Sequence, residues 1–262
     1  MQRDVERGTS QPSFTRKQIT IINNKGSSYV LDYFSFTHTL EDVASNPVVQ
    51  QKIEALEPLS DLVFPTTRRG QPLHQEMVDS LMKANIFVTI SPEGSDEIIG
   101  FSTLKRSIFK DLKIVHTSTA GISPEHTGGS LSQIARKAVV AEEDPDILYG
   151  TTIHPAIYKT YAALARDLGY RIYPQEGVST PNEIIQFTRT MLHDLSSPEA
   201  AEKLDETMVR RNYLSTAPQG EENLPYAGFG FFERDLHIQP TDGVLVLLIK
   251  PNLLDQVTSE SQ

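Results

Sequence analysis

The segment from residue 122 to residue 138 constrains the fold of this chain more than any other part of the sequence. A strand-like run over Lys113–Ile122 leads into a loop of very small residues, and a helical pattern begins at Leu131. From Gly128 to Ser132, only Leu131 carries a side chain larger than a hydroxymethyl group. Small residues let a ligand approach the main chain closely. The first amides of a helix have no partner inside the helix and carry positive partial charge. The segment therefore predicts a phosphate or pyrophosphate site in this loop.

Two common phosphate-binding motifs do not fit the loop. A Walker motif requires Gly-Lys-Ser or Gly-Lys-Thr at the start of the helix, and neither tripeptide occurs in the sequence. The dinucleotide fingerprint requires Gly-x-Gly-x-x-Gly, whereas Gly128 and Gly129 are adjacent and no third glycine lies in register. A tight glycine-rich turn without a ligand remains the alternative interpretation.

The segment resembles the acyl-coenzyme A (CoA) loop of the GCN5-related N-acetyltransferases, the GNAT superfamily. That pattern places an aliphatic residue at a strand end, a proline two residues later, and Arg/Gln-x-x-Gly-x-Gly/Ala at a helix start. Ile122 and Pro124 match it, whereas Thr127 stands where Arg or Gln is usual. Ser130 and Ser132 replace the two small residues. The resemblance implies that acetyl-CoA, as co-substrate, is bound by Ile122, Thr127, Gly128, Gly129, Ser130, Leu131 and Ser132.

Composition limits the kinds of protein to consider. The chain has 262 residues, of which 38% are hydrophobic and 22% charged, enough for a substantial core. No apolar run approaches the length of a membrane span and the N-terminus lacks an apolar signal core, so we expect no membrane association and a cytoplasmic location. The absence of cysteine excludes disulfides, cysteine nucleophiles and thiolate metal sites. A net charge of −10 without a long basic stripe argues against nucleic-acid binding.

Hydrophobic periodicity predicts strands first and then alternating strands and helices. The early strands are expected at Gln18–Asn23, Tyr29–Thr37, Asn85–Ser91, Glu97–Phe109 and Lys113–Ile122. Two helices, Leu40–Leu56 and Pro72–Lys83, are expected between the second and third strands. After the helix that begins at Leu131, the pattern continues with Asp146–Thr152 (strand), Pro155–Leu168 (helix) and Tyr170–Tyr173 (strand). Helices between these later strands indicate parallel pairing there.

This order predicts an α/β (α+β) fold, with a mixed, twisted, mostly antiparallel central sheet flanked by helices. The same order is the one that the acyl-CoA N-acyltransferase fold uses, so the resemblance extends over residues 29–173. We expect one domain over residues 18–254, with disordered tails at residues 1–17 and 255–262. Residues 175–240, which include a helix that ends near Leu195, are interpreted as an insertion of helices and loops before the last strand, Asp242–Lys250.

The resemblance also implies where the chemistry lies. In this fold the strands before and after the loop's helix splay apart, and the acyl group lies in the gap. Family members commonly place there a tyrosine that protonates the CoA thiolate, and the corresponding position here is Ala165. Tyr158 is predicted to replace it as the thiolate acid, because it lies near the helix start on a different face from Tyr161, which is interpreted as core. The alternative is an ordinary tyrosine at a polar rim.

Histidine is suited to accept the proton of an amine because it titrates near neutrality. The candidate bases are His116, Glu125, His126 and His154, and His154 occupies the position before proline where the family commonly has Asn. His116 is expected to lie on the same face of its strand as Ile122, six residues later. A structural role is the alternative for a histidine in mid-strand. The predicted catalytic residues are thus Tyr158, His116 and His154.

The leading hypothesis is an acyl-CoA-dependent N-acetyltransferase that moves an acetyl group from acetyl-CoA to a small-molecule or peptide amine by direct attack. No metal is expected, because the histidines are scattered singly without metal-ligand spacing. The alternative is a non-catalytic CoA-binding or scaffold protein with a degenerate GNAT fold. A nucleotide-phosphate enzyme on an unrelated α/β sheet is a third possibility.

Overall fold

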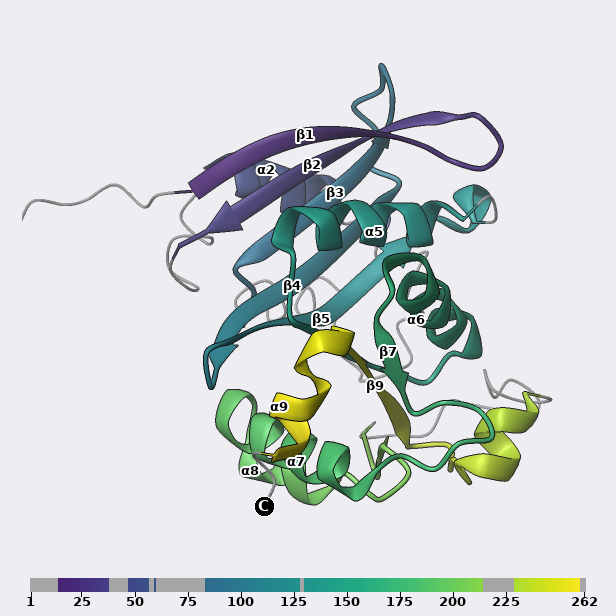
Figure 1. The fold of residues 1–262 in the computed structure, drawn as a ribbon. Coiled ribbons are helices and arrows are strands. Elements are labelled where there is room, and N and C mark those ends of the chain that lie inside the picture. The colour runs from purple at the N-terminus through teal and green to yellow at the C-terminus, as the bar shows by residue number, and fades with distance from the viewer. Residues whose placement is uncertain are drawn as a thin grey trace, which may run out of the picture.

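The computed structural model describes residues 14–37, 47–56, 59, 83–127, 130–213 and 229–259. Within them, one sheet of nine strands forms the centre of the molecule, in the order β1-β2-β3-β4-β5-β6-β9-β7, with β8 paired to β9 (Figure 1). Its first five strands form an antiparallel meander: β1 (Phe14–Ile22), β2 (Ser28–Phe36), β3 (Ile86–Pro92), β4 (Gly100–Phe109) and β5 (Leu112–Ile122). The predicted fold class, a mixed and mostly antiparallel sheet flanked by helices, is confirmed.

The second half of the sheet comprises β6 (Ile147–Thr152), β7 (Arg171–Tyr173), β8 (Val209–Arg210) and β9 (Gly243–Ile249). As predicted, β5 and β6 pair in parallel. β6 and β7 do not pair with each other, because β9 lies between them and is antiparallel to both. All seven residues of β9 are apolar or glycine and buried, so this strand is suited to a position with neighbours on both sides and both faces covered.

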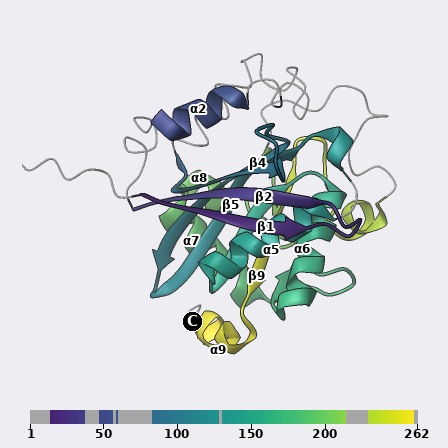
Figure 2. The ribbon, with the colours of Figure 1, turned by 90° about the horizontal axis from the view of Figure 1, so that it is seen from above.

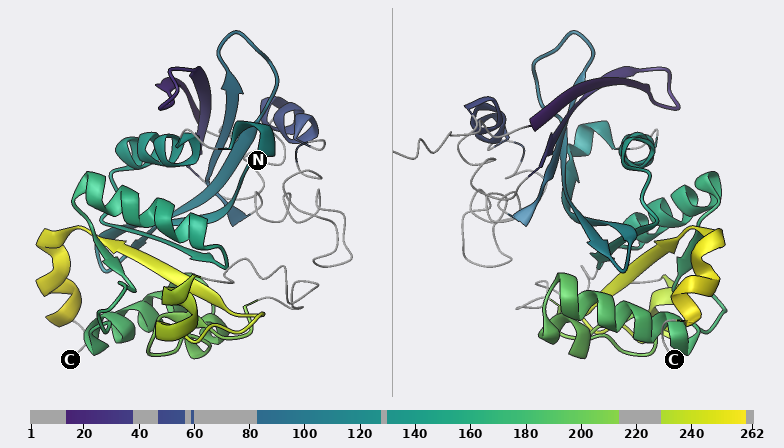
Figure 3. Two further views of the ribbon diagram at one scale, coloured as in Figure 1. Left: turned by 90° about the vertical axis from the view of Figure 1, so that its right-hand side faces the viewer. Right: turned by 60° about the vertical axis from the view of Figure 1, so that its left-hand side comes forward.

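Helices cover both faces of the sheet. They are α2 (Pro47–Ala55), α5 (Leu131–Glu143), α6 (Pro155–Leu168), α7 (Asn182–Leu195), α8 (Pro198–Glu202) and α9 (Leu254–Ser259), with short helical turns η2 (Pro124–His126), η4 (Phe231–Asp235) and η5 (Pro251–Leu253). α2 and α5 lie on opposite faces of the meander (Figure 2). α7, α8 and α9 lie together at the end of the molecule that carries β9 (Figure 3). None of the helices in the described part of the chain is long and apolar enough to cross a membrane.

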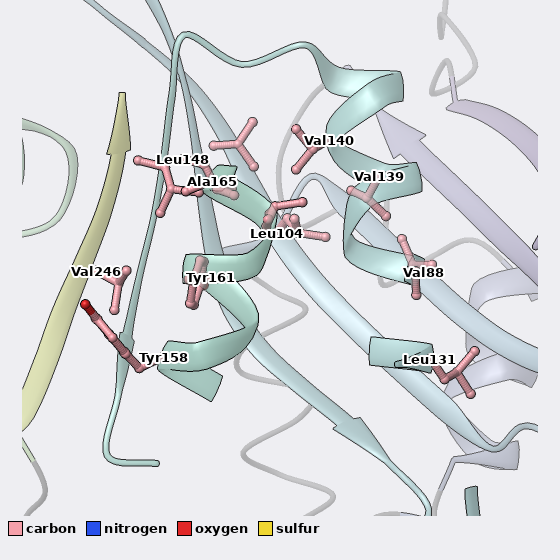
Figure 4. Packing of buried hydrophobic residues seen from close by; sticks show 14 of the residues in the cluster. Val88, Leu104, Leu131, Val139, Val140, Leu148, Tyr158, Tyr161, Ala165 and Val246 are labelled. Carbon is pink, nitrogen blue, oxygen red and sulfur yellow. The ribbon is translucent and has the colours of Figure 1, made fainter. Parts of the chain in front are cut away.

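Apolar residues form one core on each face of the sheet and a third under α2. The first packs α5 and α6 on the sheet through residues such as Val139, Tyr161 and Val246 (Figure 4). The second packs α7 on the other face, where Ile114 and Phe187 belong to one cluster. These two cores share the strands from β5 to β9. The strands from β5 to β9 are therefore held from both faces.

The helix Pro155–Leu168 is observed with the predicted bounds, and most strands agree to within a few residues. The predicted boundaries between the domain and its two tails, at residues 17/18 and 254/255, are wrong. β1 begins at Phe14, which pairs with Phe36 of β2, so four residues assigned to the first tail lie in the sheet. α9 continues to Ser259 and buries Val257 completely, so the domain does not end at residue 254. Residues 1–13 and 260–262 lie outside the described residues.

Two further regions differ in detail from the predictions. In the predicted helix Leu40–Leu56, the described part is helical from Pro47 to Ala55, and the predicted helix Pro72–Lys83 lies outside the described residues except for Lys83. The segment 175–240 contains the expected helices α7 and α8. It also contributes β8, which pairs with β9, so it extends the sheet as well as covering it.

Candidate functional site

A cavity of about 590 Å³ lies where β5 and β6 separate. Pairing between these parallel strands ends at Thr117 opposite Gly150, although both strands continue beyond that pair. The cavity extends from this point to the first turns of α5 and α6, over residues of β3 and β4. Its lining includes five of the residues predicted to bind CoA: Ile122, Thr127, Ser130, Leu131 and Ser132. The other two, Gly128 and Gly129, lie outside the described residues.

The first turn of α5 presents main-chain amides at the cavity. Ser130, at the N-cap, has the left-handed conformation (φ 61°), and its hydroxyl accepts a hydrogen bond from the side-chain Nδ2 atom of Asn24 at 2.9 Å. The helical ladder begins with the Ile134 amide, which donates to the Ser130 carbonyl at 2.9 Å. The amides of residues 131–133 precede that bond, and no acceptor for them is present among the described residues. Such amides, with the positive end of the helix dipole, suit an anionic group.

A β-bulge in β5 decides which side chains face the cavity. Thr103 of β4 pairs with Thr119, but the next residue, Leu104, pairs with Thr117, so Ser118 is the extra residue. An extra residue reverses the alternation of side chains along a strand. Thr117 and Ile122 consequently both line the cavity although they are five residues apart. The bulge also shapes the place where β5 and β6 separate.

The prediction that His116 shares a face with Ile122 is wrong, because the bulge lies between them. The His116 ring stacks on Tyr149, at 4.4 Å between ring centroids, in contact with the core under α7. Its Nδ1 atom lies 3.3 Å from the Ser118 hydroxyl. Burial, with smaller contributions from the positive charges of Arg210 and Lys105, lowers the pKa of His116 to about 4. The imidazole is therefore neutral near pH 7 and lies outside the cavity.

His154 lines the cavity as the N-cap residue of α6. Its main chain is held firmly: its amide donates to the Thr152 hydroxyl at 3.0 Å, and its carbonyl accepts from the amides of Ile157 and Tyr158 at 3.0 and 3.1 Å. The side chain is exposed. His154 is thus the one residue of the predicted catalytic set that reaches the cavity. Of the other candidate bases, His126 lines the cavity and Glu125 does not.

Tyr158 is separated from the cavity. It lies three residues before Tyr161 and seven before Ala165, so all three occupy the buried face of α6 and the expected different face is wrong. Figure 4 shows its hydroxyl directed toward the β9 side of the helix. That hydroxyl donates to the Pro174 carbonyl at 2.9 Å, and burial raises the pKa of Tyr158 to about 12. Three phenylalanines surround the ring: Phe229, Phe231 and Phe232.

Sequence reasoning did not identify two polar residues of the cavity, Arg136 and Thr117. The Arg136 guanidinium lies over the Tyr161 ring, with its carbon 4.3 Å from the ring centroid. Both the Arg136 Nη1 atom and the Thr117 hydroxyl are buried and have no hydrogen-bond partner among the described residues. The sequence does hold a signal for Arg136. It lies one turn after Ser132 and one turn before the buried Val139, so it belongs to the same face of the helix as these two residues.

No cluster of three His, Asp or Glu side chains able to hold a metal occurs in the described ranges. The expected absence of a metal therefore remains a prediction.

No protein-family profile matches this sequence, and no curated protein matches it. Solved structures do match. The ribosomal-protein-S5-alanine acetyltransferase from Vibrio fischeri is 9% identical, with 90% of this chain and 98% of that chain covered and a TM-score of 0.43. An acetyltransferase from Bacillus subtilis in complex with CoA is 12% identical over 75% of this chain and 91% of that chain, with a TM-score of 0.40.

A third match is a cAMP-binding acyltransferase from Mycobacterium smegmatis, 9% identical, with a TM-score of 0.35. It covers 60% of this chain and 45% of that one, so this chain spans less than half of that protein. GNAT-family acetyltransferases are among the structures that this chain is similar to, as the sequence resemblance indicated.

Proposed function

We propose that this protein is an acyl-CoA-dependent N-acyltransferase, a divergent member of the GNAT superfamily, which moves an acetyl group from acetyl-CoA to an amine. The observation that carries the proposal is the cavity, in which the first-turn amides of α5 and the gap between β5 and β6 meet. An anionic carrier with a long uncharged arm suits a cavity that has polar amides at one end and apolar walls at the other.

The chain's own residues have distinct proposed roles. The amides around Ser130, Leu131 and Ser132, together with Gly128 and Gly129 from the sequence resemblance, would bind the pyrophosphate. Ile122 and Thr127 would lie along the arm of the co-substrate, since both line the cavity. The thioester would lie at the gap beyond Thr117, where β5 and β6 no longer pair through main-chain hydrogen bonds.

The reaction requires an amine nitrogen to attack the thioester carbonyl carbon, so that a C–N bond forms and the C–S bond breaks. We propose that the exposed imidazole of His154 takes the proton from the amine, because it lines the cavity. His126 also lines the cavity, whereas His116 is disfavoured because it lies on the opposite face of β5 and its low pKa makes it a weak base. The thiolate leaves as the anion and is protonated by solvent.

A specific observation favours the non-catalytic alternative. No tyrosine is among the described residues that line the cavity, and Tyr158 is held by Pro174 instead. Binding of CoA without transfer would need no thiolate acid. Measurement of thiol release separates the two: acetyl-CoA is incubated with the protein and a library of amines, and free CoA thiol is followed. Release that depends on an amine supports the enzyme, whereas binding without release supports the alternative.

Ser132→Glu tests the binding site by calorimetry with acetyl-CoA. A carboxylate in the first turn of α5 repels a phosphate, and we expect the affinity to fall about tenfold or more, equivalent to about 1.4 kcal/mol. The same charge is favourable at a helix N-terminus, by about 0.3–1 kcal/mol, so the folded state should not be weakened.

Ser132→Gln is the matched control, because it adds similar bulk without charge and should change the affinity by much less. Equal affinities of Ser132→Glu and the unaltered protein for acetyl-CoA would remove the first turn of α5 from the proposed site.

The small-molecule or peptide nature of the amine and the cytoplasmic location stay predictions.

A further inference from the structure

Arg136 is a buried cation that the protein does not neutralise within the described residues. Its side chain belongs to α5, only 9% of the residue is exposed, and its Nη1 atom has no hydrogen-bond partner. Its guanidinium lies over the face of the Tyr161 ring. A ring face attracts a cation but accepts no conventional hydrogen bond, so the N–H groups of Nη1 remain available.

The acidic residues of the two helices beside the cavity are all engaged elsewhere. On α5, Glu142 pairs with Lys17, and Glu143 with Arg106. On α6, Asp167 accepts from Gln133 at 3.1 Å and lies 3.6 Å from the Lys137 ammonium. A buried charge without a partner is costly, and proteins ordinarily pair it. The missing partner of Arg136 is therefore expected to come from a ligand.

Thr117 supplies a second, independent sign of that ligand. Its hydroxyl is buried and has no hydrogen-bond partner in the described part of the chain, and the residue lines the same cavity from β5, across from the helix that carries Arg136. Buried hydroxyls and guanidinium groups are almost always hydrogen-bonded in native proteins. The surrounding walls are apolar and come from Val88, Leu104 and Val139. Two unpaired donors between apolar walls suit an oxyanion on a short carbon chain.

We infer that Arg136 and Thr117 form a carboxylate subsite inside the cavity, which gives the enzyme a preference for a ligand that carries a carboxylate. The inference rests on the proposed function. A guanidinium recognises a carboxylate with planar, charge-assisted hydrogen bonds. Two sources fit this chemistry: a dicarboxylic acyl group on CoA, or an amine acceptor with a carboxylate of its own.

The first arm of the test compares succinyl-CoA with butyryl-CoA, which have acyl chains of four carbons and differ in the terminal carboxylate. Calorimetry on the unaltered chain should show tighter binding of succinyl-CoA, by about tenfold for one charge-assisted contact. Arg136→Gln should remove that preference and leave butyryl-CoA affinity within about twofold, and Thr117→Val should reduce the preference by a smaller factor. Arg166→Gln is the matched control, because Arg166 lies on α6 with 77% of its side chain exposed.

The second arm tests the acceptor. With acetyl-CoA bound, the chain is titrated with phenylalanine and with phenethylamine, which differ in the carboxylate. A preference for phenylalanine that disappears in Arg136→Gln assigns the carboxylate to the acceptor. A preference for succinyl-CoA that disappears in Arg136→Gln assigns the carboxylate to the acyl group. Either result supports the subsite.

The melting temperature of the unliganded protein separates a ligand-binding role from a structural one. Removing an unpaired buried charge should leave that temperature unchanged or raise it, so Arg136→Gln should not melt earlier than the unaltered chain. Equal affinities within both ligand pairs, succinyl-CoA with butyryl-CoA and phenylalanine with phenethylamine, or a preference that survives Arg136→Gln, would overturn the inference alone. Failure to bind any CoA thioester would overturn the proposed function, and the subsite with it.

Discussion

Tyr158 shows at the scale of one residue how packing redirects a side chain with plausible chemistry. It lies in the right helix for an acid near the thioester gap, yet its hydroxyl donates to the Pro174 carbonyl and its ring packs among phenylalanines. A hydroxyl buried in this way, with its pKa raised to about 12, is reluctant to lose its proton. Its contribution is to the stability of the junction between α6 and the segment after β7.

Tyr158→Phe should therefore lower stability without lowering the transfer rate. The variant leaves the Pro174 carbonyl without its donor, and we expect the free energy of unfolding to fall by about 1 kcal/mol. Urea denaturation measures that loss, and thiol release measures the rate. Tyr170→Phe is the matched control, because the Tyr170 hydroxyl donates in the same way to the Pro145 carbonyl. A rate that falls about 100-fold or more in Tyr158→Phe alone would restore this residue as the thiolate acid.

At the scale of one element, α5 uses its two ends differently. Its first turn presents amides to the cavity, while Glu143 in its last turn anchors the helix to the sheet. The Glu143 carboxylate, 2% exposed, accepts hydrogen bonds from Tyr33 and from Arg106, with the Arg106 Nε atom at 2.6 Å. Lys113 contacts both the carboxylate and the main-chain carbonyl of Glu143. The anchor holds the far end of the helix while its first turn remains available to a ligand.

This anchor makes stability depend on pH. Burial acts to raise the pKa of Glu143, but the hydrogen bonds from Arg106 and Tyr33 and the positive charges of Arg106 and Lys113 together outweigh it and hold the pKa below the usual 4.5. Because the folded pKa lies below the unfolded one, the stabilisation is fully present above about pH 4.5 and is lost as the pH falls through the folded pKa. Glu143→Gln should cost about 3 kcal/mol at pH 7, the scale for breaking a buried ion pair.

Urea denaturation at pH 7 and pH 3 tests this expectation. The difference in unfolding free energy between the unaltered chain and Glu143→Gln should shrink at pH 3, where protonation weakens the ion pair in the unaltered chain as well. Glu142→Gln is the control, since its ion pair with Lys17 is more exposed and should contribute less than about 1 kcal/mol. A difference that stays the same at both pH values would contradict the assignment of the anchor to the ionised carboxylate.

At the scale of the whole molecule, β9 joins the two halves of the fold. It is the last of the described strands along the chain, yet it pairs with β6 on one side and with β7 and β8 on the other. Every residue from Val244 to Ile249 has no exposed surface. Among the described strands β1, in contrast, pairs only with β2, and most of its residues are exposed. The cavity lies between these regions, over residues of β3, β4 and β5.

Hydrogen exchange should reproduce this division. Amides of Leu245–Leu248 should exchange among the slowest in the native protein, because their release requires opening of strands on both sides and exposure of both cores. Amides of β1 should exchange by local opening of an edge, at least about tenfold faster. Mass spectrometry of peptides from the two strands, with exchange in the denatured chain as the reference, measures both. Similar protection of β1 and β9 would contradict the view that β9 forms the most stable part of the sheet.

Local sequence determined much of this protein by itself. The period of 3.6 over residues 155–168 and the proline and glycine at its ends define α6 to the residue, because these signals act within a few turns of chain. The small residues after Ile122 likewise identified the loop, and the described members of that set line the cavity. Both depend on contacts between near neighbours in the chain.

Tertiary structure decided which side chains meet in the cavity. The bulge at Ser118 depends on the register with Thr103 and Leu104 of another strand, and it places His116 on the face away from the cavity. The Tyr158 hydroxyl donates to the Pro174 carbonyl of another segment, and the Arg136 Nη1 atom is buried with no hydrogen-bond partner among the described residues. The spacing of apolar residues along one strand or helix does not tell where pairing with a neighbouring strand shifts, or which distant residue a side chain will contact. The chemistry of the site therefore becomes visible only when those partners are in place.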